Sequence, residues 1–251
     1  MCTLTIIPAT EASGGVWRLA FNRDEQRTRA AGTEPRLVDV GGRRAAHPVD
    51  ATAGGTWIAT TDAGLALATL NRNEPGLPDG RAPGASRGAL ILALLEAETL
   101  DDAAARAATA ATAVTRGFRL VATDGARVLE VTGGGDAPAT IAIEPLVRPF
   151  LRASSGLGDA LVGPPRAELF AATVLRAPPD AWPAAQTAFH DHAWSDRRHL
   201  SVRMDRDEAR TVSRTFIEVA RDAIRMRHAN RTDRAPDARF DPEHTIDLPR
   251  R

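Results

Sequence analysis

The residue best suited to covalent chemistry in this sequence is its single cysteine, Cys2, which directly follows the initiator methionine. The initiator is normally removed when the second residue is small, which would leave Cys2 with a free α-amine beside its thiol. These two groups have ordinary pKa values of about 8 and about 8.5. The amine can therefore take the proton of its own thiol at neutral pH, without a histidine. Cys2 predicts an N-terminal nucleophile; the alternative is a buried thiol with no reactive role.

A charged tetrapeptide, Asn22-Arg23-Asp24-Glu25, follows the second expected strand. If the first two strands pair as a hairpin, this segment returns close to Cys2. A guanidinium beside the thiol would favour the thiolate, and a carboxylate would hold the α-amine or order Arg23. The tetrapeptide therefore predicts a charged wall beside the cysteine. The alternative is a polar strand end that forms ion pairs at the surface.

An asparagine, Asn71, stands where the expected strand 65–70 ends. Strand ends often carry catalytic groups, and its side-chain amide can donate a hydrogen bond to an oxyanion. The alternative is that Asn71 and Asn73 simply form the turn that follows, since asparagine favours turns.

Three other motifs predict no site. In His190-Asp191-His192 the two imidazoles are two residues apart, so they do not share a helix face. Gly133–Gly135 lacks the spacing of a dinucleotide-binding loop. Ser154-Ser155-Gly156 is not the Gly-x-Ser-x-Gly turn that exposes a nucleophilic serine. We therefore expect neither a metal nor a cofactor.

The composition excludes several mechanisms and partners. The sequence has no lysine and no tyrosine, so a lysine Schiff base, a P-loop lysine and a tyrosine acid are ruled out. It has 32 basic and 32 acidic residues without a long basic run, which argues against a nucleic-acid partner. One cysteine forms no intrachain disulfide. With no apolar run of membrane-spanning length and no signal-peptide pattern, we expect a cytoplasmic protein.

The order of expected elements is strands, a helix pair, strands, a second helix pair and strands. The regular alternation of strand and helix that builds a doubly wound parallel sheet is missing. The sequence therefore predicts an α+β fold, an αββα four-layer sandwich with helices outside two antiparallel sheets. We expect one domain over residues 1–231 and a polar C-terminal tail over 232–251. The expected strands are 2–8, 16–21, 36–40, 54–59, 65–70, 118–123, 127–131, 140–143, 150–154, 200–204, 212–219 and 223–228, and the expected helices are 89–95, 101–115, 165–175 and 182–192.

Several motifs occur in the same order in the NRDE family, of the transport-and-Golgi-organisation type. They are Cys2 after Met1, Asn22-Arg23-Asp24-Glu25, Gly54-Gly55-Thr56-Trp57 and the segment from Gly64 to Asn71. The likeness is strong over residues 1–75 and looser after that. It implies a fold of the N-terminal-nucleophile hydrolase type, more distantly similar to choloylglycine hydrolases and penicillin V acylases.

The resemblance also implies roles for individual residues. Cys2 would be the nucleophile and, through its amine, the base. Asp24 would position the amine, Arg23 the thiolate, and Asn71 would join the oxyanion hole. The relatives use a late arginine, for which Arg214 or Arg210 is the candidate. Where they have an asparagine in the middle of the chain, this sequence places Ser154 or Ser155.

These observations predict an N-terminal cysteine hydrolase that acts on an amide bond of a small molecule. The alternative is a carrier or binding protein for a hydrophobic ligand, such as haem or an acyl group. A third possibility is an interaction protein with a degenerate site. The first two differ in the surroundings of Cys2. A hydrolase places Cys2, Asp24 and Asn71 around one pocket, whereas a carrier has a large apolar cleft. The oligomeric state is not predicted.

Overall fold

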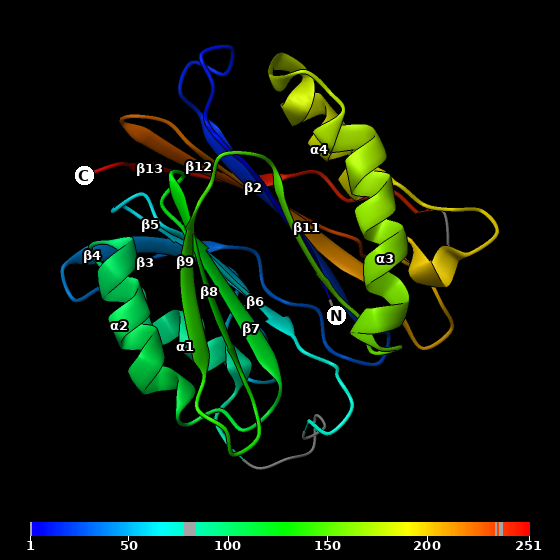
Figure 1. Ribbon diagram of the computed structural model, residues 1–251, viewed down its shortest axis with the longest axis horizontal. Helices are drawn as coiled ribbons and strands as arrows, with labels where there is room; N and C mark the ends of the chain where they lie inside the picture. The colour runs from blue at the N-terminus through cyan, green and yellow to red at the C-terminus, as the bar shows by residue number, and fades with distance from the viewer. Residues whose placement is uncertain (1, 78–83, 234, 236–237) are drawn as a thin grey trace.

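The structure is a computed structural model that describes residues 2–77, 84–233, 235 and 238–251. Two antiparallel sheets face each other, with one pair of helices outside each, so the predicted αββα sandwich is confirmed (Figure 1). The first sheet has six strands in the order β10-β1-β2-β11-β12-β13. Their bounds are β1 Cys2–Ile7, β2 Trp17–Gln26, β10 Phe150–Ser154, β11 Ala209–Val219, β12 Ala223–Asn230 and β13 His244–Pro249.

The second sheet has seven strands, ordered as they follow one another in the chain from β3 to β9. Their bounds are β3 Arg36–Val40, β4 Arg43–His47, β5 Ile58–Thr61, β6 Ala66–Asn71, β7 Phe118–Thr123, β8 Arg127–Gly133 and β9 Thr140–Pro145. Helices α1 (Arg87–Ala93) and α2 (Leu100–Ala111) cover the outer face of this sheet, and α3 (Asp159–Phe170) and α4 (Trp182–Asp191) cover the first sheet (Figure 1).

Side-chain alternation in β1 shows how the layers form. Leu4 and Ile6 are fully buried in the core between the sheets, together with Cys2. The alternate residues, Thr3 and Thr5, face the α3–α4 layer. Because successive residues of a strand point to opposite faces, this is the division that the sequence predicts. It places the thiol inside the sandwich and not under the helices.

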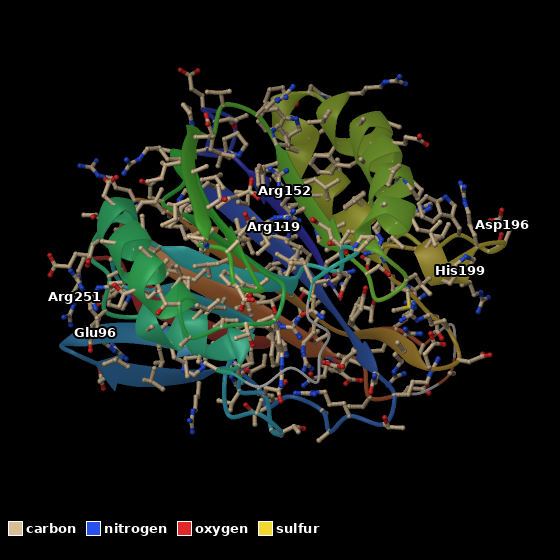
Figure 2. The ribbon with its side chains drawn as sticks, turned by 60° about the horizontal axis from the view of Figure 1, so that its bottom comes forward. Glu96, Arg119, Arg152, Asp196, His199 and Arg251 are labelled. Carbon is tan, nitrogen blue, oxygen red and sulfur yellow. The ribbon has the colours of Figure 1, made fainter. Side chains whose placement is uncertain are left out.

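A charged contact also links the two sheets. Glu130 in β8 accepts hydrogen bonds from Arg152 in β10 and lies 3.5 Å from Arg119 in β7. Figure 2 shows Arg119 and Arg152 beside each other. Both arginines are partly covered, so this triad joins the edge strand β10 of the first sheet to the interior strands β7 and β8 of the second.

Several expected elements differ from the structure. Strand β4 was not predicted, and β2 continues through the charged tetrapeptide to Gln26. The expected strand 200–204 is instead a short 3-10 turn, Arg198–Leu200, followed by bends. The expected helix 165–175 begins at Asp159 and continues beyond α3 as a π-helical turn, Ala171–Leu175.

The segment expected to be a polar tail also has a different structure. Residues 244–249 form β13, which pairs with β12 from Ala223↔Pro249 to His228↔His244. Ile246 and Leu248 are buried and alternate with exposed residues, which is typical of an edge strand with one face on the core. Within the described residues, no helix is long and apolar enough to cross a membrane.

Candidate active site

Cys2 lies at the wall of a cleft of about 810 Å³ at one end of the sandwich. Both sheets contribute to the cleft, together with the start of α1. Of the predicted site residues, Cys2, Arg23, Asp24 and Asn71 line it. Four residues from three strands thus line one cleft, and the pairing of β1 with β2 that the sequence predicts brings Arg23 opposite Cys2.

The position of Cys2 is fixed by strand pairing on both sides. It lies opposite Arg23 of β2 and opposite Ser154 of β10. Its backbone N–H donates to Ser154 Oγ at 3.2 Å. Only 5% of Cys2 is exposed, and this burial raises the pKa of its thiol. The thiol is therefore protonated at neutral pH in this form, so an ionised nucleophile requires a base.

Arg23 shares the inward face of β2 with the thiol. Its guanidinium lies over the Trp57 ring, 4.1 Å from the centroid, and pairs with Asp50 at 2.8 Å and Glu25 at 3.2 Å. Its charge acts to lower the pKa of Cys2, although burial has the larger effect. The stacking and the two ion pairs hold the guanidinium flat against the cleft wall.

Asp24 points to the opposite face of β2, under the helices. Its Oδ1 accepts from Thr211 Oγ1 at 2.5 Å, and its Oδ2 lies 3.6 Å from Arg166 without a hydrogen bond. Burial raises the pKa of this carboxyl, and Arg166 opposes the shift. Cys2 lies opposite Arg23 in the antiparallel β1–β2 pair. Asp24 is the next residue of β2, so it lies beside the end of β1 that carries the amino terminus. An unsatisfied carboxylate oxygen there is suited to an amine donor.

Asn71 is the last residue of β6 and is half-buried at the cleft. The next residue, Arg72, donates its backbone N–H to Gly117 O at 3.1 Å, which fixes the strand end. This placement suits a donor to a bound carbonyl.

Met1, whose removal the sequence predicts, lies outside the described residues.

The structure does not bring Arg214 to the cleft. Its guanidinium bonds to Asp191 of α4 and lies 3.7 Å from Glu243, on the helix side of the first sheet. The reason is a bulge in β11 between Thr211 and Ser213, which shifts the register with β2 and leaves Arg214 opposite Asn22. The expectation that Arg214 joins the site is therefore corrected. Arg210 does not line the cleft either, since it bonds to the backbone carbonyls of residues 231–233.

The structure also separates the paired histidines. His190 is buried between Thr5 and Asn22, with ring nitrogens at 2.7 and 3.0 Å from their side-chain oxygens. Burial holds its pKa well below the usual range. His192 stacks edge-on against Trp194 instead. His190 is part of the packing between α4 and the first sheet.

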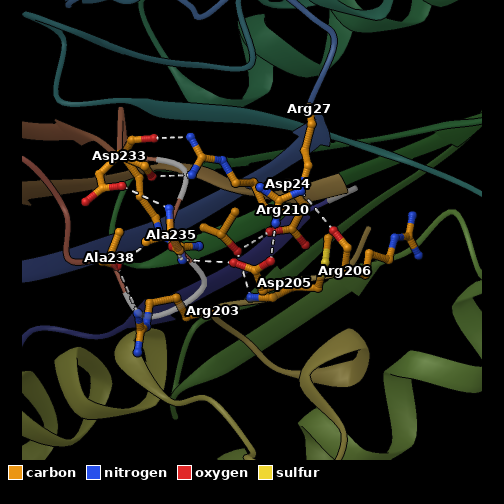
Figure 3. Close-up of polar contacts among 12 residues, drawn as sticks. Asp24, Arg27, Arg203, Asp205, Arg206, Arg210, Asp233, Ala235 and Ala238 are labelled. Atoms are coloured by element: carbon orange, nitrogen blue, oxygen red, sulfur yellow. Dashed lines mark hydrogen bonds and ion pairs between the residues drawn. The ribbon is translucent and has the colours of Figure 1, made fainter. Parts of the chain in front are cut away.

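A charge network follows the end of β2 (Figure 3). Asp205 accepts hydrogen bonds from Arg27, at the end of β2, and from Arg231, at 2.9 Å. Arg231 also donates to the carbonyl groups of Ala235 and Ala238. The network joins β2, the loop before β11 and the segment after β12, so it supports the strand that carries Arg23 and Asp24.

The cleft residues that the sequence analysis missed include Arg87, Thr69 and Arg206. Arg87 stands at the first turn of α1, after the cap Ser86, whose side chain accepts from Gly88 N. An arginine at the start of a helix does not by itself predict a site residue. It reaches the cleft because α1 packs closely against Gly55 and Thr56.

The family model for Transport and Golgi organisation 2 (TANGO2) matches residues 1–139, more than half of the chain. The chain belongs to this family. The match covers Cys2, Arg23, Asp24 and Asn71, and it ends before the two candidates for the late arginine, Arg210 and Arg214. Among curated proteins, none gives a significant match to the chain.

Solved structures of N-terminal-nucleophile hydrolases have the same fold. A Caenorhabditis elegans N-acylethanolamine-hydrolyzing acid amidase (NAAA) ortholog has a TM-score of 0.54 at 11% identity, covering 85% of this chain and 92% of that one. Two variants of conjugated bile acid hydrolase from Clostridium perfringens have TM-scores of 0.52 and 0.53 at 10% and 9% identity. They cover 99% and 98% of this TANGO2-family chain, and 92% of their own. At these identities the likeness shows the fold alone.

Proposed function

We propose that this TANGO2-family protein is an N-terminal cysteine hydrolase that cleaves an amide bond of a small molecule in the cytoplasm. The observation that supports it most is that Cys2, Arg23 and Asn71 line one cleft, with Asp24 behind the same strand. A nucleophile, a cation and an amide donor at one cleft are the parts that acyl transfer uses.

Activation begins with removal of Met1, which converts the Cys2 amide nitrogen into an α-amine. Ser154 Oγ, now 3.2 Å from that nitrogen, accepts one of its N–H bonds. The unsatisfied Oδ2 of Asp24 offers a second acceptor near the amino terminus. The buried thiol is protonated, so the amine takes its proton as the sulfur attacks the amide carbonyl carbon.

Attack forms a carbon–sulfur bond and moves the carbonyl π electrons onto oxygen. Asn71 donates its side-chain N–H to that oxyanion. When the carbonyl re-forms, the carbon–nitrogen bond breaks, and the α-ammonium gives its proton to the leaving amine. A water molecule then attacks the thioester, with the α-amine taking its proton. Collapse releases a carboxylic acid and returns the proton to the thiol.

One observation favours the alternative, a carrier for a hydrophobic ligand. A second cavity, of about 510 Å³, lies between the β9–β10 connection and α3, with Leu146, Val147 and Phe170 among its apolar lining residues. Cys2 does not line it. A ligand held there would bind equally well to wild type and to Cys2→Ala, which separates this function from hydrolysis.

The test is intact mass combined with thiol alkylation and a screen of small amides, on wild type and Cys2→Ala. Loss of Met1, saturable labelling at Cys2 and turnover that Cys2→Ala abolishes are the expected results. Arg106→Gln, on the outer face of α2 and paired with Asp102, is the matched control and retains turnover. Retained Met1, or turnover that survives Cys2→Ala, would overturn the mechanism.

A further inference from the structure

The cleft beside Cys2 is charged on several sides. Arg23, Arg29, Arg87, Arg116 and Arg206 line it, together with the acidic residues Asp24, Glu25, Asp50 and Glu208. Most of these charges are paired with one another. Glu25 and Asp50 pair with Arg23 and Arg29.

The remaining carboxylates of the cleft are also paired. Glu208 lies 2.9 Å from Arg206, and Asp24 turns away toward Arg166. Arg87 differs from the paired arginines, because it makes no ion pair with any residue that the structure describes. Within the described part of the chain, its one hydrogen bond runs from Nη1 to Gly117 O at 3.2 Å. A guanidinium has five N–H donors, so the others remain available to a ligand.

Arg87 is held next to the residues of the proposed reaction. The Gly117 carbonyl that it contacts also accepts the backbone N–H of Arg72, the neighbour of Asn71. The guanidinium therefore lies beside the strand end that offers a donor to the scissile carbonyl. Burial lowers the pKa of Arg87, and the nearby Arg116 lowers it further, so an anion would relieve both effects.

The backbone that carries Arg87 is firmly placed. Thr56 N donates to Gly88 O at 3.4 Å, and a Cβ on Gly88 would meet Thr56 backbone atoms at 2.8 Å. The start of α1 therefore packs directly against the backbone of the Gly54-Gly55-Thr56-Trp57 segment. The seated backbone and the hydrogen bond to Gly117 O together place the guanidinium at the cleft wall.

We propose that Arg87 is a specificity-determining residue, which binds a carboxylate located within a few bonds of the amide that Cys2 attacks. This inference rests on the proposed function for the identity of the scissile bond. A single carboxylate fits better than a phosphate dianion, because Arg23 and Arg29 already pair with Glu25 and Asp50, and one guanidinium matches one carboxylate. The substrate class is therefore a small amide that bears one carboxylate, on either the acyl or the amine half.

The test measures binding to Cys2→Ala, which removes the thiol and keeps the cleft. The probes are N-benzoylglycine and N-phenylsuccinamic acid, each compared by calorimetry with its neutral carboxamide. At least one acid should bind about tenfold or more tightly than its carboxamide, as expected for a charge-assisted, bidentate contact. Adding Arg87→Gln should abolish that preference, Arg87→Lys should retain part of it, and the surface control Arg106→Gln should retain all of it.

Three outcomes would overturn the inference: no binding of either acid, equal binding of acid and carboxamide, or a preference that survives Arg87→Gln in a protein whose melting temperature shows that it is folded. Tighter binding of the phosphonate analogue of N-benzoylglycine would overturn the single-carboxylate assignment. Because this binding requires no thiol, a wild-type protein without turnover but with Arg87-dependent binding would refute the proposed hydrolysis and not this site.

Discussion

The backbone nitrogen of Cys2 and the hydroxyl of Ser154 are 3.2 Å apart, and the hydroxyl accepts the hydrogen bond. The contact crosses the β1–β10 pair, where Cys2 and Ser154 face each other directly. Once Met1 is removed, the same nitrogen is the amine that we propose as the base. Ser154 would then hold the base in place, in the part of the chain where the resemblance implies an asparagine.

Ser154→Ala tests this positioning role. A hydroxyl that accepts an N–H from the amine favours its charged form, so its loss should lower the pKa of the amine. The pH profile of Cys2 alkylation should therefore shift to lower pH, and turnover should fall about tenfold. The free energy of unfolding of Ser154→Ala should be only about 1 kcal/mol lower than that of wild type. Ser155→Ala is the control, since Ser155 Oγ bonds to Leu157 N and does not touch Cys2. Equal profiles for both variants would refute the role.

His228 predicts an acid-labile core. It is 1% exposed, bonds to Thr215, and burial lowers its pKa from 6.5 to about 4. The folded state therefore favours the neutral ring. The contribution of neutral His228 to stability is complete above pH 6.5. It is lost as the pH falls from 6.5 through 4, and the total loss is about 3 kcal/mol.

The measurement is urea unfolding of wild type and His228→Gln between pH 4 and pH 7.5. His190 is also buried with a lowered pKa, and it acts equally in both proteins. The difference in unfolding free energy between them therefore isolates His228. That difference should shrink by about 3 kcal/mol toward acid; a constant difference would contradict the prediction.

Gly88→Ala tests the contact that seats α1. The added methyl group would meet backbone N and O of Thr56 at 2.8 Å, and backbone atoms do not move aside cheaply. We expect a loss of about 1–3 kcal/mol in unfolding free energy, as in other overpacked sites. Gly163→Ala is the control, because nothing lies within 4 Å of its added Cβ. Equal stability of the two variants would show that α1 adjusts freely.

Much of the cleft could be predicted because it depends on strand periodicity. Alternation in the first strand places Cys2 with Leu4 and Ile6, and a hairpin brings Arg23 opposite Cys2. Such pairings follow from the two-residue period of a strand and from a short connection. Asn71 also follows from a strand end. No comparable rule links Ser154 to Cys2, which is 152 residues away in the sequence.

The late arginine shows why the remainder could not be predicted. Arg210 lies opposite Glu25, and without the bulge Arg214 would lie opposite Phe21, on the face that Cys2 occupies. The extra residue places it opposite Asn22 instead, on the helix face. One inserted residue reverses every side chain that follows it, and the sequence of β11 carries no signal for its position.

The network around Asp205 provides the sharpest stability test. Asp205 accepts from Arg27 and Arg231, and the Arg231 side chain is fully buried. Asp205→Ala would leave the buried Arg231 guanidinium without this carboxylate, which costs about 3–5 kcal/mol in comparable buried pairs. Asp247→Ala breaks a similar contact with Arg225 at the surface, where both side chains are more than half exposed. The free energy of unfolding of that control should fall by less than about 1 kcal/mol. Chemical denaturation of the two variants measures both losses, and equal losses would mean that the Asp205 network contributes no more than a surface ion pair.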